Sequence, residues 1–137
     1  YGIPVIIAAH PKAKYVGSEF GDRRIVQGET GSLVKGANMV LLHTSNSVSY
    51  CILYDKPMAL ITNKEYGKNR DLSSTQKKLS LLLKMPIFDV DHIDMTDFNP
   101  RKLNQEERSE YIYSYLTSKN TEMKRNKDIL LAKLLNL

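Results

Sequence analysis

The feature that most constrains this chain is a short apolar run leading directly into a turn rich in hydroxyl groups. Residues 39–42 (Met-Val-Leu-Leu) precede the sequence His-Thr-Ser-Asn-Ser-Val-Ser-Tyr at positions 43–50. The apolar run predicts a buried parallel strand, and the change of pattern after it predicts a helix that starts near Ser45 to Ser47 and runs to about Tyr54. First-turn N–H groups of such a helix lack intrahelical partners, so this turn is a candidate anion site. The same hydroxyl groups can instead serve as a helix cap.

Apolar runs and helical patterns alternate along the rest of the chain. We expect strands at residues 2–9, 24–27, 39–42, 58–62 and 86–91, and helices at 30–37, 45–54, 73–85, 104–116 and from Thr121 onward. Residues 12–22 are expected to form a loop or a short helix, and 63–70 a loop. Strands that alternate with helices, without hairpin signals, indicate a parallel sheet covered on both faces. We therefore predict an α/β domain at residues 1–100, a Rossmann-like parallel sheet of about five strands with helices on both faces, followed by C-terminal helices at 101–137.

Local patterns also predict how some of these elements begin and where they are buried. The run at residues 2–9 is apolar throughout, which is typical of a strand buried on both faces. Thr30 or Ser32 is expected to cap the helix at 30–37. Ser73 and Gln76 have the spacing of a capping box, which predicts a helix beginning at Ser73.

Three polar turns follow the carboxyl ends of the expected strands. Because such sheets bind ligands outside these ends, the three turns should lie on one rim. They are His10-Pro11-Lys12, Gly28-Glu29-Thr30, and His43-Thr44-Ser45-Asn46-Ser47. An imidazole such as that of His10 can donate a hydrogen bond to a phosphate, carry a positive charge or protonate a leaving oxygen. His10 can equally cap its strand by bonding a backbone carbonyl, and the sequence leaves both roles open.

Neither histidine of these turns is accompanied by a third ligand at metal-site spacing, which argues against a metal there. Asp89 and Asp91 alternate on an expected strand and could face one divalent cation, although a solvated acidic loop is the favoured interpretation. Cys51, the single cysteine, excludes an internal disulfide and fits a reducing compartment. Its apolar neighbours predict a buried, unreactive thiol. No glycine-rich dinucleotide motif, P-loop or Gly-x-Ser-x-Gly sequence is present.

The net charge of +5 is concentrated between residues 62 and 84, where six cations face two acids. Such a balance suits nucleic acid, an anionic membrane surface or a phosphorylated ligand. The chain has no Trp and no nucleic-acid motif, which argues against nucleic acid. No apolar stretch is long enough to span a bilayer. We expect a cytoplasmic location, or one at the cytoplasmic face of the membrane with peripheral contact to the inner membrane surface.

In chain order, the motifs are Val5 to Lys12, with its His-Pro pair; Gly28-Glu29-Thr30 before a helix; Val40 to Tyr50, with its Ser/Thr-rich turn; and Lys56-Pro57. This order resembles the C-terminal, donor-binding half of bacterial surface-polysaccharide glycosyltransferases of the GT-B fold. It is most similar to those related to capsule, sialic acid and Kdo transferases, which share a His-Pro motif and a later Ser/Thr-rich motif. The resemblance covers residues 3–62, and the remainder only by general pattern.

The resemblance implies that His10 is the catalytic residue and that, with Ser45 and Ser47, it contacts the phosphate and sugar of a nucleotide-sugar donor. It places the turn at 28–30 near the nucleoside and requires no metal. The family's second motif often has adjacent hydroxyl residues, whereas Asn46 separates the two serines here. Either serine could therefore bind the donor.

The resemblance further implies an N-terminal half as partner, which would supply the acceptor side. Because the chain begins at Tyr1 and enters an apolar run at once, we expect an excised domain that binds donor without transferring sugar. The last helix would pack on its own sheet or on the missing half through Leu130, Leu131, Leu134 and Leu135. Two alternatives stay open: a sugar-nucleotide epimerase domain, and a non-catalytic Rossmann-like module that recruits a protein through Tyr111, Tyr115 and the last helix.

Overall fold

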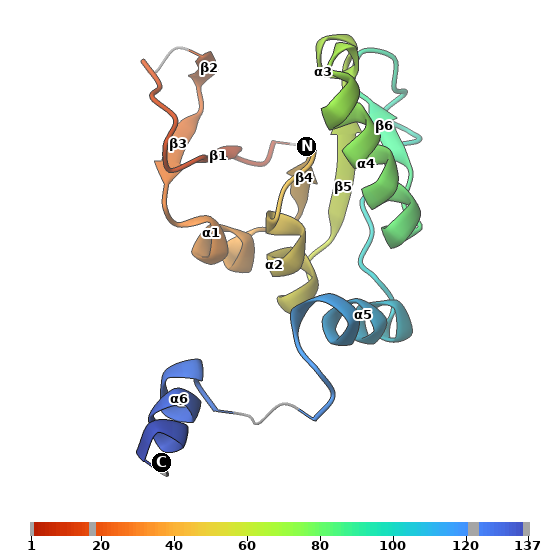
Figure 1. The fold of residues 1–137 in the computed structure, drawn as a ribbon. Helices are drawn as coiled ribbons and strands as arrows, with labels where there is room; N and C mark the ends of the chain where they lie inside the picture. Colours follow the sequence, from red (N-terminus) through yellow and green to blue (C-terminus); the bar gives the residue numbers. More distant parts are fainter. Residues whose placement is uncertain (1, 17–18, 121–123, 136–137) are drawn as a thin grey trace. The chain divides into compact units, whose positions relative to one another are not determined.

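A computed structural model describes residues 2–16, 19–120 and 124–135 of the chain (Figure 1). The chain divides into two compact units, Tyr1–Asn104 and Gln105–Leu137, and each is described by itself. The first unit contains parallel strands connected by helices, which confirms the expected α/β class. The strands form two small sheets instead of the expected single sheet of about five strands.

The larger sheet carries the core of the first unit. Its strands β4 (Val40–Leu42), β5 (Met58–Thr62) and β6 (Ile87–Asp89) are parallel and lie in that order. The central strand β5 coincides with the strand predicted at 58–62, and its first three residues are at most 1% exposed. A central strand with neighbours on both sides is where apolar side chains bury most completely, which explains the continuous run Met-Ala-Leu-Ile.

The smaller sheet pairs β1 (Ile6–Ala9) with β3 (Arg24–Gln27), and β2 (Glu19–Asp22) lies between them in sequence. Residues 12–22 therefore include a strand, where a loop or short helix was expected. β1 is shorter than the run at 2–9, because Gly2 has a positive φ of 60° and Pro4 has no N–H to donate to a ladder. Among the described residues, no ladder joins β1 to β4.

The prediction that the first strand is buried on both faces is wrong. Ile6 is 45% exposed and Val5, just before the strand, is 50% exposed, whereas Ala9 is buried. Leu41 of β4 is likewise 47% exposed. An apolar run shows that a segment can be buried but does not identify what covers it, so both strands keep exposed apolar residues: Ile6 and Ala8 in β1, and Leu41 in β4.

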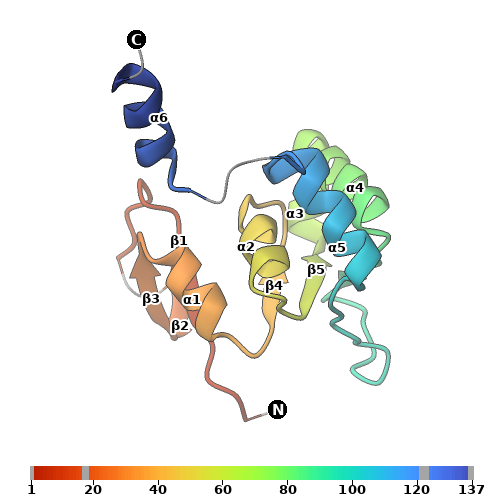
Figure 2. The ribbon, with the colours of Figure 1, turned by 90° about the horizontal axis from the view of Figure 1, so that it is seen from below.

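Four helices complete the first unit: α1 (Thr30–Gly36), α2 (Ser47–Leu53), α3 (Lys64–Lys68) and α4 (Arg70–Leu83). Helices α1 and α2 lie side by side in both views (Figures 1 and 2). Residues 63–70 were expected to form a loop, but contain α3 and the start of α4. Asn63 and Asn69 cap these two helices by accepting from the N–H groups of Tyr66 and Leu72, respectively.

Helix α4 therefore begins three residues before Ser73, and the predicted capping box is not formed. Asn69 accepts the first-turn N–H instead, which leaves Gln76 inside the helix as a residue that faces the core. The helix ends at Leu83, and Lys84 adopts the left-handed conformation that commonly terminates helices. Pro86 follows, as the sequence pattern predicts.

The second unit contains α5 (Gln105–Tyr111), continued as a π-helical turn at Ile112–Leu116, and α6 (Asn126–Leu135). The rings of Tyr111 and Tyr115 lie 5.1 Å apart, as their four-residue spacing predicts. The predicted helix start at Thr121 lies outside the described residues. None of the helices in the described part of the chain combines the length and apolar content that crossing a bilayer requires.

Candidate functional site

The His10 turn, residues 10–13, directly follows β1. The Lys12 N–H donates to Nδ1 of His10 at 3.1 Å, and the Ala13 N–H donates to the His10 carbonyl at 3.0 Å. Because Nδ1 accepts a hydrogen bond, the proton of the neutral ring resides on Nε2. The side chain is exposed, so this turn presents an imidazole whose Nε2–H can donate to an anion. The alternative role, in which the ring bonds a backbone carbonyl, is not the arrangement found at Nδ1.

Gln27, the last residue of β3, fixes the His10 turn from the neighbouring strand. Its Nε2 donates to the His10 carbonyl at 3.3 Å and to the Ala13 carbonyl at 2.6 Å. The strand register pairs Ala9 with Gln27, so the turn that follows β3 begins beside the His10 turn. The structure thus brings together two of the three predicted turns.

The turn at 28–30 connects β3 to α1. Gly28 has a φ of 77°, which a side chain would strain. Glu29, not Thr30 or Ser32, occupies the N-cap position, and its side chain makes no capping hydrogen bond. The predicted cap is therefore wrong, because the helix begins one residue earlier than a Thr30 cap would require. Gly28 and Glu29 are exposed, while Thr30 is half-buried.

The His43 turn, residues 43–47, connects β4 to α2. Thr44 Oγ1 lies 2.6 Å from the hydroxyl oxygen of Tyr66, and the His43 ring stacks on the Tyr66 ring with centroids 4.5 Å apart. Ser45 Oγ donates to Ser47 Oγ at 2.8 Å and accepts from the Ser47 N–H at 3.1 Å. Among the hydroxyl groups, that of Thr44 is thus engaged by Tyr66, whereas the two serines bond each other.

The first-turn N–H groups of α2 are less available than the sequence pattern suggests. The Val48 N–H donates to the Ser45 carbonyl at 3.2 Å, and the Ser49 N–H donates to the Asn46 carbonyl at 3.1 Å. These bonds, with that from Ser47 to Ser45, satisfy three N–H groups inside the turn. Helix α2 begins at Ser47, at the end of the range predicted for its start, because the turn closes on itself first. An anion here would bind mainly through the serine hydroxyls.

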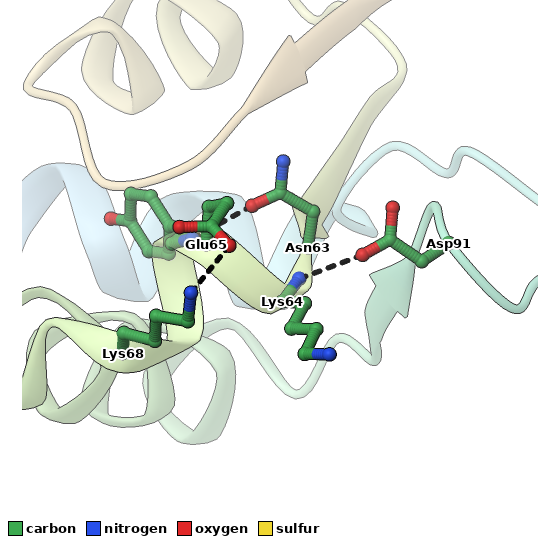
Figure 3. A network of polar contacts seen from close by, with 6 residues as sticks. Asn63, Lys64, Glu65, Lys68 and Asp91 are labelled. Atoms are coloured by element: carbon green, nitrogen blue, oxygen red, sulfur yellow. Dashed lines mark hydrogen bonds and ion pairs between the residues drawn. The ribbon is translucent and has the colours of Figure 1, made fainter.

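Tyr66 reaches the His43 turn because α3 holds it there. Asn63 Oδ1 accepts the Tyr66 N–H at 2.7 Å, and the Lys64 N–H donates to Asp91 Oδ2 at 2.8 Å. Lys68 and Glu65 pair across one turn of the same helix (Figure 3). The sequence analysis missed Tyr66, although Asn63 followed by Glu65 in the first turn is a signal for a capped helix.

Gln76 of α4 is the second residue of the site that the sequence analysis misassigned. Its Nε2 donates to the His43 carbonyl at 3.2 Å and to the Ile61 carbonyl at 2.7 Å, and its side chain is 2% exposed. The two histidines that directly follow strands therefore have the same support, since each backbone carbonyl accepts from a glutamine amide. Among the described residues, no hydrogen bond joins the His10 turn to the His43 turn.

Packing of α1 on α2 relates the turn at 28–30 to the His43 turn. A Cβ added to Gly31 would lie 3.3 Å from the Tyr50 ring, which is tighter than ordinary contact. Gly31 is the second residue of α1 and Tyr50 the fourth of α2. The beginnings of the two helices that follow these turns are thus packed together.

The acidic loop after β6 forms a local network of exposed groups. Asp89 Oδ2 lies 2.9 Å from Nδ1 of His92, and this contact raises the pKa of His92 while it lowers the pKa of Asp89. Asp91 instead accepts from Lys64, so the two carboxylates do not share one partner. In the described part of the chain, no group of three His, Cys, Asp or Glu side chains could hold a metal ion.

Cys51 lies in the core and not at the site. It is fully buried, and burial raises the pKa of its thiol to about 11. A thiol with so high a pKa carries almost no thiolate at neutral pH. This confirms the prediction of a buried, unreactive cysteine.

No family model, curated protein or solved structure was found to match this chain. The chemistry of the site is therefore argued from its own groups. These are an exposed imidazole with a donor at Nε2, two serine hydroxyls and a glycine turn that begins beside the His10 turn. Donors of this kind can bind oxyanions, among them phosphate.

Proposed function

We propose that this chain is the donor-binding half of a glycosyltransferase that transfers a sugar from a nucleotide-sugar to a surface-polysaccharide acceptor. The observation that carries the proposal is the geometry of His10. Its exposed ring follows a parallel strand, and the Lys12 N–H occupies Nδ1, so Nε2–H is the donor available to a ligand. The motif order that resembles capsule, sialic acid and Kdo transferases supports the same assignment.

In this proposal His10 acts on the leaving phosphate. The bond between the sugar and the phosphate oxygen breaks, and negative charge grows on that oxygen. Because Nδ1 already accepts from the Lys12 N–H, the ring acts as a hydrogen-bond donor: Nε2–H donates to this oxygen and lowers the cost of its charge. The sugar passes to an acceptor bound by the N-terminal half, which is the proposed partner. The chain alone would bind donor without completing the transfer.

The remaining site residues bind the donor around His10. Pro11 and Lys12 would bind the donor beside His10, whose ring accepts from the Lys12 N–H. The turn at 28–30, which begins beside the His10 turn, would contact the nucleoside. Ser45 and Ser47 would replace their mutual hydrogen bond with bonds to phosphate. Thr44 would contribute through Tyr66 and not directly, because its hydroxyl is already engaged.

Calorimetric titration with CMP, CDP, UDP, UMP and GDP tests the proposal. We expect one nucleotide to bind saturably, and His10→Ala to weaken its binding about tenfold, the loss expected for a charge-assisted hydrogen bond. His92→Ala is the matched control, because His92 is exposed and also lies in a turn after a strand, but outside the proposed site. Tight binding that His10→Ala leaves unchanged would refute the role of that residue. Absence of binding at millimolar concentration would refute donor binding by this chain.

A second candidate, a module that recruits a protein, is favoured by α6. Four leucines of this short helix are at least 44% exposed: Leu130, Leu131, Leu134 and Leu135. Exposed leucines on one helix commonly mark a protein contact.

We also propose peripheral contact with the inner membrane surface. The exposed cations between residues 62 and 84 would make this contact and would bring the chain close to an acceptor at the membrane.

A further inference from the structure

Gln76 hydrogen-bonds two segments that belong to neighbouring strands or directly follow them. One of the two carbonyls belongs to His43, the first residue after β4. The other belongs to Ile61, the next-to-last residue of β5. We propose that Gln76 is a positioning residue, which sets the place of the His43 turn relative to β5 and thereby the place of the serine hydroxyls. This inference rests on the proposed function, because the hydroxyls are those assigned to the donor phosphate.

The chemistry at position 76 requires a neutral amide. Two carbonyl oxygens face one nitrogen, and an amide nitrogen carries two N–H donors. A methionine of similar length would fill the space but donate nothing. An ionised glutamate would place a negative charge against two carbonyl oxygens, which is unfavourable at a buried position. Because the side chain is 2% exposed, water cannot readily replace a missing donor.

Anchors on the His43 turn are confined to its first two residues. Gln76 holds the His43 carbonyl, Tyr66 stacks on the His43 ring, and the Tyr66 hydroxyl bonds Thr44. Ser45 and Ser47, by contrast, bond each other. The position of the serine hydroxyls therefore depends on His43 and Thr44, which precede them and are held by residues of α3 and α4.

Amide hydrogen exchange followed by NMR tests this role without a ligand. Gln76→Met should accelerate exchange at the N–H groups of Ser47, Val48 and Ser49 on the order of tenfold, the factor that corresponds to one lost buried hydrogen bond. Lys77→Met makes the same new residue at the adjacent, exposed position and should leave these rates unchanged. Leu83→Val removes a methylene from the same helix at a buried position away from the turn. It should change the global stability without a selective effect on these three amides.

Two exchange results would overturn the inference: unchanged rates in Gln76→Met, or equal acceleration of the three amides in Leu83→Val. The nucleotide that wild type binds then provides a separate measurement. Gln76→Met should raise its Kd about tenfold, while Lys77→Met should not. Equal affinity of wild type and Gln76→Met would show that the position of the turn does not matter for binding and would overturn the inference. If wild type binds no nucleotide, the proposed function fails, and the exchange rates alone decide whether Gln76 positions the turn.

Discussion

The His10 turn and the His43 turn are built by the same device in different surroundings. In each, a histidine follows a parallel strand and its backbone carbonyl accepts from a glutamine amide. Gln27, which supports the first turn, is exposed, whereas Gln76, which supports the second, is buried. Water can replace an exposed donor at little cost, but it does not readily reach the buried position that the Gln76 amide occupies. The glutamine hydrogen bond therefore fixes the His43 turn, whereas it only favours the conformation of the His10 turn.

The two histidine rings also differ in how firmly they are held, and again the His43 turn is the more constrained. The His43 ring is stacked on Tyr66, and the next residue is bonded to that tyrosine's hydroxyl. His10 has a backbone N–H at Nδ1 and is otherwise open to solvent. The comparison indicates that the His43 turn is a preset support for hydroxyl groups, and that the His10 turn presents a ring able to adjust to a ligand.

The largest expected effect is on stability, and it tests the comparison directly. Gln76→Met should lower the free energy of unfolding by about 2 kcal/mol, because it leaves two carbonyls without a donor at a buried position. Gln27→Met should lower it by less than about 1 kcal/mol, since Gln27 is exposed and water can take the place of its amide. Urea denaturation of the two variants measures both values. Equal losses would show that burial is not what distinguishes the two turns.

Removing the hydroxyl group of Tyr66 should give the next largest loss of stability. Tyr66→Phe keeps the stack on His43 but deletes the hydrogen bond to Thr44, which should cost about 1 kcal/mol. Urea denaturation is again suitable, with Tyr113→Phe, an exposed tyrosine in the second unit, as control. A loss no larger than that of the control would mean that Thr44 finds another partner and that the turn is less preset than we argue.

A smaller difference separates the two serines. Ser45→Ala removes both the acceptor of the Ser47 N–H and a hydroxyl bond, which should cost about 1 kcal/mol. Ser47→Ala removes only the hydroxyl bond at an otherwise intact turn, and its loss should be smaller. Thermal unfolding compares the pair. If Ser47→Ala is the more destabilising variant, Ser45 is not the residue that closes the turn.

The third histidine gives the smallest effect. Asp89 raises the pKa of His92 above its ordinary 6.5, and His92 in turn lowers the pKa of Asp89 below 3.8. The stabilisation from His92 is present below pH 6.5 and is lost as the pH rises through the raised pKa. That from Asp89 is present above 3.8 and is lost as the pH falls through the lowered pKa. Any stabilisation by this pair is thus confined to mildly acidic conditions.

NMR titration of the ring protons of His92 checks this pair. In Asp89→Asn, the pKa of His92 should fall towards 6.5, because the charge that favours the imidazolium is removed. Because both groups are exposed, unfolding temperatures should barely change. A His92 pKa that is the same in wild type and variant would contradict the contact. It would also remove the contrast between this open loop and the two glutamine-supported turns.

Sequence patterns predicted the individual elements better than their assembly. The strands at 24–27 and 58–62 were predicted at the bounds observed for β3 and β5. The split into two sheets was not predicted, because the apolar run at 2–9 does not show which strands it will pair with. Gly2 and Pro4 are the local residues that shorten it. Pairing between strands also depends on segments far apart in the chain, which periodicity does not report.

For the site, the sequence identified the turns but not what supports them. His10, Gly28 and His43 follow strands as expected. Gln76 was assigned to a capping box, since its spacing from Ser73 is a local pattern. Asn69 caps the helix instead, and that one change of start leaves Gln76 to face the core. Tyr66 was hidden because residues 63–70, rich in polar residues and containing Gly67, resembled a loop.

The sequence by itself determined where β1, β3, β4 and β5 end and which polar residues follow them, because both depend on neighbours a few positions away. The strand expected at 86–91 ends at Asp89 instead, and β2 was not expected. Only the tertiary structure decided which groups meet at those ends. Tyr66 lies 22 residues from Thr44, and Gln76 lies 33 residues from His43. The hydrogen bonds between them form because β5, α3 and α4 return the chain to the carboxyl end of β4.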